Sequence, residues 1–252
     1  LTGVGIYSNY KLIANNLNNL LGQIFTGFAA SIGNLAVTED KGRVKEVFST
    51  LNLACFLLYG YCCVAMAVLF RPFIELFFGE RYILSWGTVL LLLTQFYLTG
   101  MRMVTQQFRN AMGIFWFDRY RPLVEVVLNL VISLAAVRKY GIAGILMGTV
   151  LSLLLIPVWM EPYMLFKYGI KEKLMMWYCR NYILQTGMLA VDGCAIYWLC
   201  SFSPGEGIAG LCIRGVECTV LYAITMMVCF GGTREWKELV SYARRAVLRR
   251  NE

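Results

Sequence analysis

Histidine is absent from these 252 residues, and charged residues make up only 15% of them. Without an imidazole, catalysis by a Ser-His or Cys-His pair is excluded within this chain. The nine cysteines form no CxxC pair, which disfavours a zinc site. The phosphate-binding patterns GxGxxG and GxxxxGK[ST] are also missing, so nothing indicates an ATP-driven pump. We therefore expect no catalytic residue, no metal, no cofactor and no enzymatic activity.

Hydrophobic residues are abundant instead: they make up 59% of the chain, and the mean hydropathy is +0.61. A helix needs about 20 mostly apolar residues to cross a hydrocarbon layer roughly 30 Å thick. The runs here are continuously apolar, whereas the strands of a membrane barrel alternate over about ten residues. The sequence therefore predicts an all-α fold, a polytopic membrane helix bundle of about seven transmembrane helices, at residues 10–37, 51–70, 83–101, 123–137, 142–166, 182–201 and 208–230. The segment 123–137 is short and needs the long basic side chains beside it to reach outward.

Lysine and arginine gather on one side of these spans, which the positive-inside rule assigns to the cytoplasm. This pattern predicts a cytoplasmic C-terminus and places Leu1 on the outer face. In residues 232–252, apolar side chains recur at helical spacing among basic ones. We expect a basic amphipathic cytoplasmic tail that lies on anionic lipid and does not bind nucleic acid. The larger basic group is Lys41, Arg43, Lys45, Arg102, Arg109, Arg119, Arg121, Lys167, Lys171, Lys173, Arg180, Arg234, Lys237, Arg244, Arg245, Arg249 and Arg250.

The first span carries polar residues at helical spacing, most of them amides. Its amide stripe consists of Asn15, Asn18, Asn19 and Gln23. Such a stripe cannot face lipid without leaving amides unpaired, so it faces other helices or a wet cavity. Two readings remain open: hydrogen bonds between helices, each worth only about 0.6 kcal/mol, or the lining of a substrate cavity.

Two further polar stripes follow in the next spans. One runs along the third span and past its end, and the other climbs one face of the fourth. Arg121 and Glu125 are one turn apart and are expected to pair. The candidate cavity residues from these stripes are Gln95, Arg102, Arg109, Arg121, Glu125 and Asn129.

Three charges lie within the last two spans, where each costs at least about 2.5–3.5 kcal/mol unless it is paired or hydrated. Arg214 and Glu217 are three residues apart, and Asp192 lies mid-span in the sixth segment. We expect an intramembrane charge cluster in which these residues neutralise one another. Separately, Gly144 and Gly148, with Ser152, form a ridge of small residues that permits close helix packing.

Several segments, in this order, resemble the polysaccharide flippases, the Wzx/RfbX-like branch of the multidrug/oligosaccharidyl-lipid/polysaccharide (MOP) exporter superfamily. They are VGIYSNYKLIANNLNNLLGQIF (4–25), GNLAVTEDK (33–41), RPFIELFFGERY (71–82), FYLTGMR (96–102), FRNAMGIFWFDRYRP (108–122), YGIAGILMGT (140–149) and WMEPYMLFKYGI (159–170). The ordered set covers about two-thirds of the chain, and beyond residue 170 only the hydropathy agrees.

The resemblance implies the C-terminal half of a transporter with a MATE-like fold, whose N-terminal half would precede residue 1. Residues 1–170 would form the C-terminal lobe, 171–231 two additional helices and 232–252 the tail. The implied function is export of undecaprenyl-diphosphate-linked oligosaccharide repeat units across the bacterial cytoplasmic membrane by alternating access, for surface polysaccharide biosynthesis. The substrate, membrane lipids, a polysaccharide polymerase and glycosyltransferases would be its partners.

Three alternatives stay open. A small-molecule or drug exporter of the same superfamily would need unpaired acidic residues in its cavity, whereas arginines and amides outnumber acids here. A non-transporting membrane scaffold fragment would dock biosynthetic enzymes on its basic face. A membrane-embedded glycosyltransferase or polymerase would need a large outer segment, and the predicted outer loops are too short for one.

Overall fold

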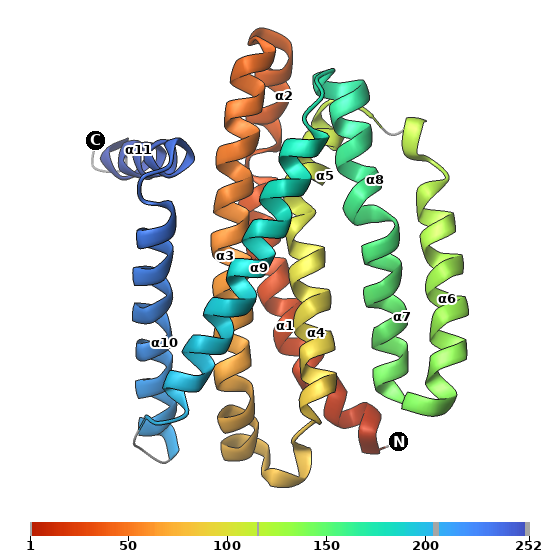
Figure 1. The fold of residues 1–252 in the computed structure, drawn as a ribbon, viewed down its shortest axis with the longest axis vertical. Coiled ribbons are helices and arrows are strands. Elements are labelled where there is room, and N and C mark those ends of the chain that lie inside the picture. Colours follow the sequence, from red (N-terminus) through yellow and green to blue (C-terminus); the bar gives the residue numbers. More distant parts are fainter. Residues whose placement is uncertain (1, 115, 204–206, 250–252) are drawn as a thin grey trace.

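The computed structural model describes residues 2–114, 116–203 and 207–249, and all of its regular elements are helical. Figure 1 shows an elongated bundle in which most helices run along the long axis and α11 lies across one end. The elements are α1 (Thr2–Thr26), α2 (Ala29–Thr38), α3 (Lys41–Phe78), η1 (Glu80–Tyr82), α4 (Trp86–Met101), α5 (Met103–Ala111), η2 (Trp116–Asp118), α6 (Arg121–Tyr140), α7 (Ile142–Leu155), α8 (Pro157–Met164), η3 (Leu165–Ile170), α9 (Met175–Cys200), α10 (Gly207–Phe230) and α11 (Arg234–Arg249).

Helix α3 is the central element of the bundle. Its 38 residues rise about 57 Å, which exceeds the roughly 30 Å of a hydrocarbon layer, so the helix is longer than a span requires. The Asp40 side chain caps its first turn by accepting a hydrogen bond from the Arg43 amide at 3.2 Å. Helices α4, α9, α10 and α11 all pack against it. The fully buried Phe48 meets Phe108 and Phe166 edge to face, with ring centroids 5.2 and 5.4 Å apart.

Six helical segments among the described residues are long and apolar enough to cross a membrane: Gly5–Thr38, Lys41–Phe78, Trp86–Ala111, Ile142–Ile170, Met175–Cys200 and Gly207–Phe230. The protein is therefore a multi-pass membrane protein. The predicted seventh span, residues 123–137, falls within α6, which does not meet that standard of composition. Nevertheless, α6 is 20 residues long and runs beside α7, and the start of α1 and helix α11 lie at opposite ends of the bundle (Figure 1).

Several predicted spans are not single straight helices. Residues 10–37 are divided between α1 and α2 by a turn at Gly27 and Phe28. Residues 142–166 are divided at Ile156, because Pro157 has no amide hydrogen to continue the α7 ladder. A third break, at Arg102, separates α4 from α5 and lies beside the ion pairs described below.

The hairpin of α6 and α7 depends on small residues at the contact. Gly141, with φ of +58°, joins the two helices in a backbone conformation that side chains rarely adopt. A Cβ atom at Gly144 would lie 2.5 Å from the Ala136 carbonyl carbon, and one at Gly148 would lie 2.8 Å from the Ser133 nitrogen. The close helix packing predicted for this ridge is therefore confirmed.

Candidate functional site

Charged side chains gather where the end of α4, α5, the start of α6 and α8 meet. Glu161, on α8, lies at the centre with no exposed side-chain surface. Its carboxylate accepts hydrogen bonds from Arg102, at 2.9 Å from Nε and 2.7 Å from Nη2. It also lies 3.3 Å from Arg109 Nη1 and 2.9 Å from Arg121 Nη2, and Gln106 Nε2 donates to it at 3.3 Å. One carboxylate is thus shared by three guanidinium groups.

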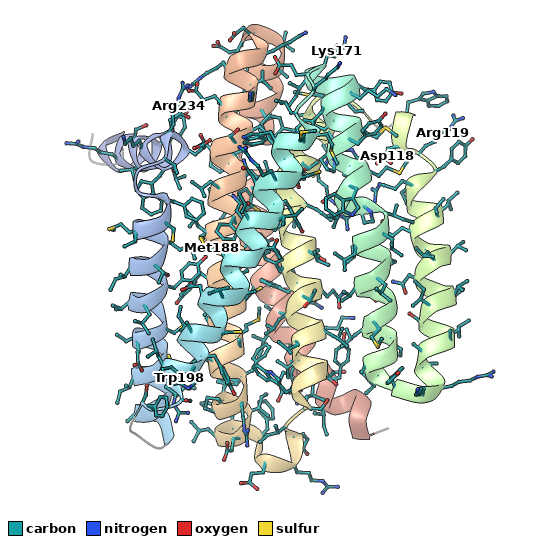
Figure 2. All side chains as sticks on the ribbon, in the orientation of Figure 1. Asp118, Arg119, Lys171, Met188, Trp198 and Arg234 are labelled. Atoms are coloured by element: carbon teal, nitrogen blue, oxygen red, sulfur yellow. The ribbon has the colours of Figure 1, made fainter. Side chains whose placement is uncertain are left out.

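Two further carboxylates complete this ion-pair network around Arg121. Asp118 accepts a hydrogen bond from Arg121 Nε at 2.8 Å and pairs with Arg109. Glu125 accepts from Arg121 Nη1 at 2.8 Å and lies 3.8 Å from Arg102 Nη1, so the predicted pairing of Arg121 with Glu125 is confirmed. Figure 2 places Asp118 toward the end of the bundle at which α11 lies, which we call the α11 end.

The network carries no net formal charge, because three arginines face three carboxylates. The arginine side chains are only 9–11% exposed, so an unmatched charge among them would be poorly hydrated. Removing one partner of such a buried pair costs about 3–5 kcal/mol. Two atoms, Arg109 Nε and Asp118 Oδ1, have no hydrogen-bond partner. The network thus links four helices, and an anion could reach its guanidinium groups only if a carboxylate moved away.

Sequence reasoning finds four members of this network, Arg102, Arg109, Arg121 and Glu125, but misses Glu161 and Asp118. Glu161 had a signal, since it is the only charged residue in the apolar segment 142–166, and an ionisable residue in a span is a functional candidate by default. Asp118 had no comparable signal because it lies outside the predicted spans, in the short element η2. That these arginines line a substrate cavity stays a prediction.

The amide stripe of α1 is divided between a packed side and an exposed side. Asn18 lies half-buried, and its Oδ1 accepts a hydrogen bond from the hydroxyl of the fully buried Tyr59 at 3.0 Å. Asn15, Asn19 and Gln23 are exposed on the surface of the bundle. The helix-packing reading therefore holds for Asn18, whereas the lining of a substrate cavity by the other three amides stays a prediction.

A small cavity lies between this face and α4. Its volume is about 70 Å³, and Lys11, Asn15, Asn18, Gln95 and Thr99 contribute its polar lining. The Gln95 Oε1 atom is buried there without a hydrogen-bond partner. The cavity is polar and large enough for one or two waters, since each water occupies about 30 Å³ in the liquid. This cavity therefore continues the polar face of α1 onto α4.

The last candidate from the polar stripes, Asn129 on α6, joins two helices. Its amide nitrogen donates to Thr149 Oγ1 on α7 at 3.3 Å, and its carbonyl oxygen accepts from Ser133 Oγ at 3.1 Å. These bonds lie along the close α6–α7 contact, so they explain the polar side chain of Asn129 as part of the packing between the two helices.

The expected neutralisation of Arg214 by Glu217 or Asp192 is not found. No ion pair within 4 Å joins these three among the described residues. Glu217 accepts a hydrogen bond from Ser203 at the turn before α10, and Asp192 accepts one from Thr225 Oγ1 at 3.2 Å. Arg214 Nε is buried without a hydrogen-bond partner. Sequence spacing failed here because hydroxyl groups on neighbouring segments lie closer to both carboxylates than the guanidinium does.

Comparison with protein-family models, with curated proteins and with solved structures gave no match to this chain. The class of protein that the fold defines is therefore a multi-pass helical membrane protein, with six segments suited to span a membrane among its described residues. Any narrower assignment depends on the chain's own residues.

Proposed function

We propose that this chain is a lobe of a membrane flippase that moves undecaprenyl-diphosphate-linked oligosaccharide repeat units across the bacterial cytoplasmic membrane by alternating access. The observation that carries the proposal is the exposed amide face of α1. Asn15, Asn19 and Gln23 are exposed on a helix suited to span a membrane. In hydrocarbon these amides would lack partners. They therefore require a polar environment, which a cavity for sugar hydroxyls supplies.

The chemistry of this face suits a glycan joined to a phosphate. Each amide both donates and accepts hydrogen bonds, as hydroxyl groups require. Lys11 is exposed beside Asn15 and has no ion-pair partner within 4 Å among the described residues, so it is available to an anion. The three arginines of the ion-pair network are occupied by carboxylates, so we assign Lys11 a contact with the diphosphate.

The ion-pair network has a different role in this proposal. It joins α4, α5, α6 and α8 at the α11 end, where we place the cytoplasmic face because Lys171 and Arg234 also lie there (Figure 2). In the described conformation it closes that end of the lobe. Exchange of these ion pairs would accompany opening toward the cytoplasm, which alternating access requires.

The partners and the fold follow from the same proposal. The chain acts in the MATE-like arrangement, with α6 as a seventh span and with a second lobe facing α1 across the cavity. The polymerase and the glycosyltransferases of the same biosynthesis would meet its cytoplasmic and outer faces.

The test is the sidedness of the lipid-linked oligosaccharide pool in cells whose gene for this protein is deleted, in a strain without a redundant flippase. A glycosidase or lectin that cannot enter spheroplasts reports the outer pool. We expect the oligosaccharide to accumulate on the cytoplasmic face, and restoring the gene to return it outward. A normal outer pool with normal surface glycan would contradict the proposal, and a loss of drug resistance alone would favour a small-molecule exporter.

A matched pair of variants tests the face itself. Asn19→Leu with Gln23→Leu removes two exposed amides, and we expect it to slow export while membrane insertion is retained. Thr94→Leu is the control, because Thr94 is exposed on α4, donates its hydroxyl hydrogen bond to the Leu90 carbonyl oxygen at 2.8 Å and does not line the α1–α4 cavity. Equal export by both variants would mean that the amide face does not contact substrate.

A further inference from the structure

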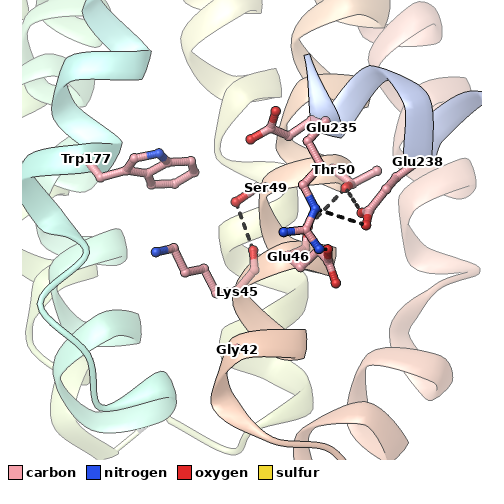
Figure 3. Close-up of a pocket in the computed structure, with 9 residues that line it drawn as sticks. Gly42, Lys45, Glu46, Ser49, Thr50, Trp177, Glu235 and Glu238 are labelled. Carbon is pink, nitrogen blue, oxygen red and sulfur yellow. Dashed lines mark hydrogen bonds and ion pairs between the residues drawn. The ribbon is translucent and has the colours of Figure 1, made fainter. Parts of the chain in front are cut away.

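A second polar groove, separate from the amide face, opens at the α11 end between α3, α9 and the start of α11. It consists of two adjoining cavities of about 550 and 360 Å³, which share Ser49, Trp177 and Glu235. We call them the outer and the inner cavity. Figure 3 shows Lys45 and Trp177 pointing toward each other across the outer cavity, with Glu235 beside them at the start of α11. Because the basic amphipathic tail is predicted to lie on anionic lipid, we expect lipid headgroups beside this groove.

Part of the charge in the groove is already paired. Arg234 pairs with Glu46 and lies 3.9 Å from Glu238, whose other carboxylate oxygen accepts a hydrogen bond from Thr50 at 2.8 Å. Together with a hydrogen bond of 2.7 Å from Arg43 to the Tyr242 hydroxyl, these contacts fix α11 on the first turns of α3. The wall of the groove that α11 provides is therefore held in place.

Three other charges of the groove are free to bind a ligand. Lys45, Arg180 and Glu235 have no ion-pair partner within 4 Å in the part of the chain that the structure describes. Arg180 and Glu235 both line the inner cavity, and Lys45 lies in the outer cavity that adjoins it. Because the inner cavity offers one cation and one anion, a zwitterion complements it better than an ion of either sign.

The inner cavity also holds two buried amides with unused acceptors. Asn52 and Gln185 are 3% and 8% exposed, and both line this cavity. Neither Asn52 Oδ1 nor Gln185 Oε1 has a hydrogen-bond partner. Leaving a buried polar atom unpaired costs about 1–3 kcal/mol. A ligand that donates several hydrogen bonds would therefore satisfy the two carbonyl oxygens.

The rest of the inner cavity is apolar. Leu53, Leu184, Met188 and Phe230 line it along α3, α9 and α10. Polar and charged groups at the α11 end thus give way to an apolar surface along the helices. This change from a polar to an apolar lining matches a molecule with a charged head and a hydrocarbon tail.

We propose that the groove binds the headgroup of a phosphoethanolamine phospholipid from the bilayer. The phosphate would lie between Arg180 and Lys45. The ammonium carries three N–H donors, which would meet the Glu235 carboxylate and the amide oxygens of Asn52 and Gln185. A choline headgroup has the same charges but no donor, and a glycerol headgroup has donors but no cation for Glu235. The proposal makes no use of the transport function, because the headgroup is that of an ordinary bilayer lipid.

The experiment is native mass spectrometry of the purified full chain with equimolar dioleoyl phosphatidylethanolamine, phosphatidylglycerol and phosphatidylcholine. We expect one phosphatidylethanolamine to be retained about tenfold over phosphatidylcholine, the ratio given by roughly 1.4 kcal/mol from charge-assisted hydrogen bonds. Equal retention of the ethanolamine and choline lipids, or a preference for phosphatidylglycerol, would overturn the proposal.

Two variants make the assignment residue-specific. Glu235→Gln removes the free carboxylate, and we expect phosphatidylethanolamine retention to fall to that of phosphatidylcholine while the latter is unchanged. Glu39→Gln is the control, because Glu39 is an exposed carboxylate between α2 and α3 that does not line the groove. Identical lipid retention by the two variants, both monodisperse with wild-type circular dichroism, would also overturn the proposal.

Discussion

Arg102 and Glu161 form a two-point ion pair, with Nε and Nη2 of the guanidinium 2.9 and 2.7 Å from the two carboxylate oxygens, although 59 positions separate the residues. The pair links the end of α4 to α8, and Arg109 and Arg121 share the same carboxylate. Since Glu161 has no exposed side-chain surface, the stability of this part of the bundle depends on its charge.

Glu161→Gln keeps the shape of the side chain but leaves three guanidinium groups with two carboxylates. We expect a loss of about 3–5 kcal/mol, the typical cost of breaking a buried ion pair. The measurement is unfolding in detergent followed by circular dichroism. The control is Glu125→Gln, where the carboxylate is 22% exposed and a smaller loss is expected. Equal effects of the two variants would mean that Glu161 is not the centre of the network.

The coupling between Arg102 and Glu161 can be measured by a double-mutant cycle. Arg102→Met with Glu161→Met removes both charges, so the double variant should be more stable than the sum of the single variants predicts. Residues in one ion-pair network typically show interaction energies of about 0.5–3 kcal/mol. Additive effects would show that the pair contributes nothing as a pair.

Asn18 and Asn19 are adjacent in sequence, but replacement by leucine is expected to lower stability at Asn18 and to slow export at Asn19. Asn18→Leu removes the acceptor of the fully buried Tyr59 hydroxyl, so we expect a stability loss of about 1–3 kcal/mol. Asn19→Leu changes an exposed position and should leave stability intact while slowing export. Melting curves of both variants, together with the sidedness assay, check this separation. A stability loss at Asn19 equal to that at Asn18 would contradict it.

Gly148→Ala tests the close contact of α6 with α7. The new methyl group would lie 2.8 Å from the Ser133 nitrogen and 3.0 Å from the Asn129 carbonyl oxygen, so the helices would have to separate. We expect a loss of about 1–3 kcal/mol, as for other overpacked contacts. Gly187→Ala is the matched control in α9, because a Cβ atom there meets nothing within 4 Å. That variant should be neutral, or stabilising by up to about 1 kcal/mol through helix propensity.

Arg214→Leu should leave the abundance and thermal stability of the protein unchanged or slightly improve them. The guanidinium has no ion pair within 4 Å among the described residues, and its Nε is buried without a partner. Its removal therefore leaves no carboxylate without an ion-pair partner. Reduced abundance in membrane fractions, measured by immunoblot against Glu39→Gln, would show that Arg214 is neutralised after all.

The residues whose roles the sequence predicted correctly act through local spacing. Arg121 and Glu125 pair because one helical turn brings them together, and Gly144 and Gly148 make a contact surface because they lie on one helix face. Each of these outcomes follows from the neighbours along the chain, which the sequence contains in full.

The wrong prediction and the missed Glu161 involve partners that are distant in sequence. Arg214 was expected to pair with Glu217, but Ser203 occupies that carboxylate from across a turn. Likewise, Glu161 gains its importance from arginines 40 or more positions away. Periodicity reports which face of a helix a residue occupies, but not which other helix meets that face.

By itself, the sequence determined that this chain is a helical, multi-pass membrane protein, because long apolar runs have no stable place in water. It also determined which helix faces are polar. Only the tertiary structure decided which of those polar groups are satisfied. It encloses the charges of Arg102, Arg109 and Arg121 in a neutral network. It also brings Asn18 within hydrogen-bond distance of the Tyr59 hydroxyl, whereas Asn15, Asn19 and Gln23 stay exposed. The reason is that hydrogen bonds and ion pairs act over about 3–4 Å, and only the packing of the helices sets those distances.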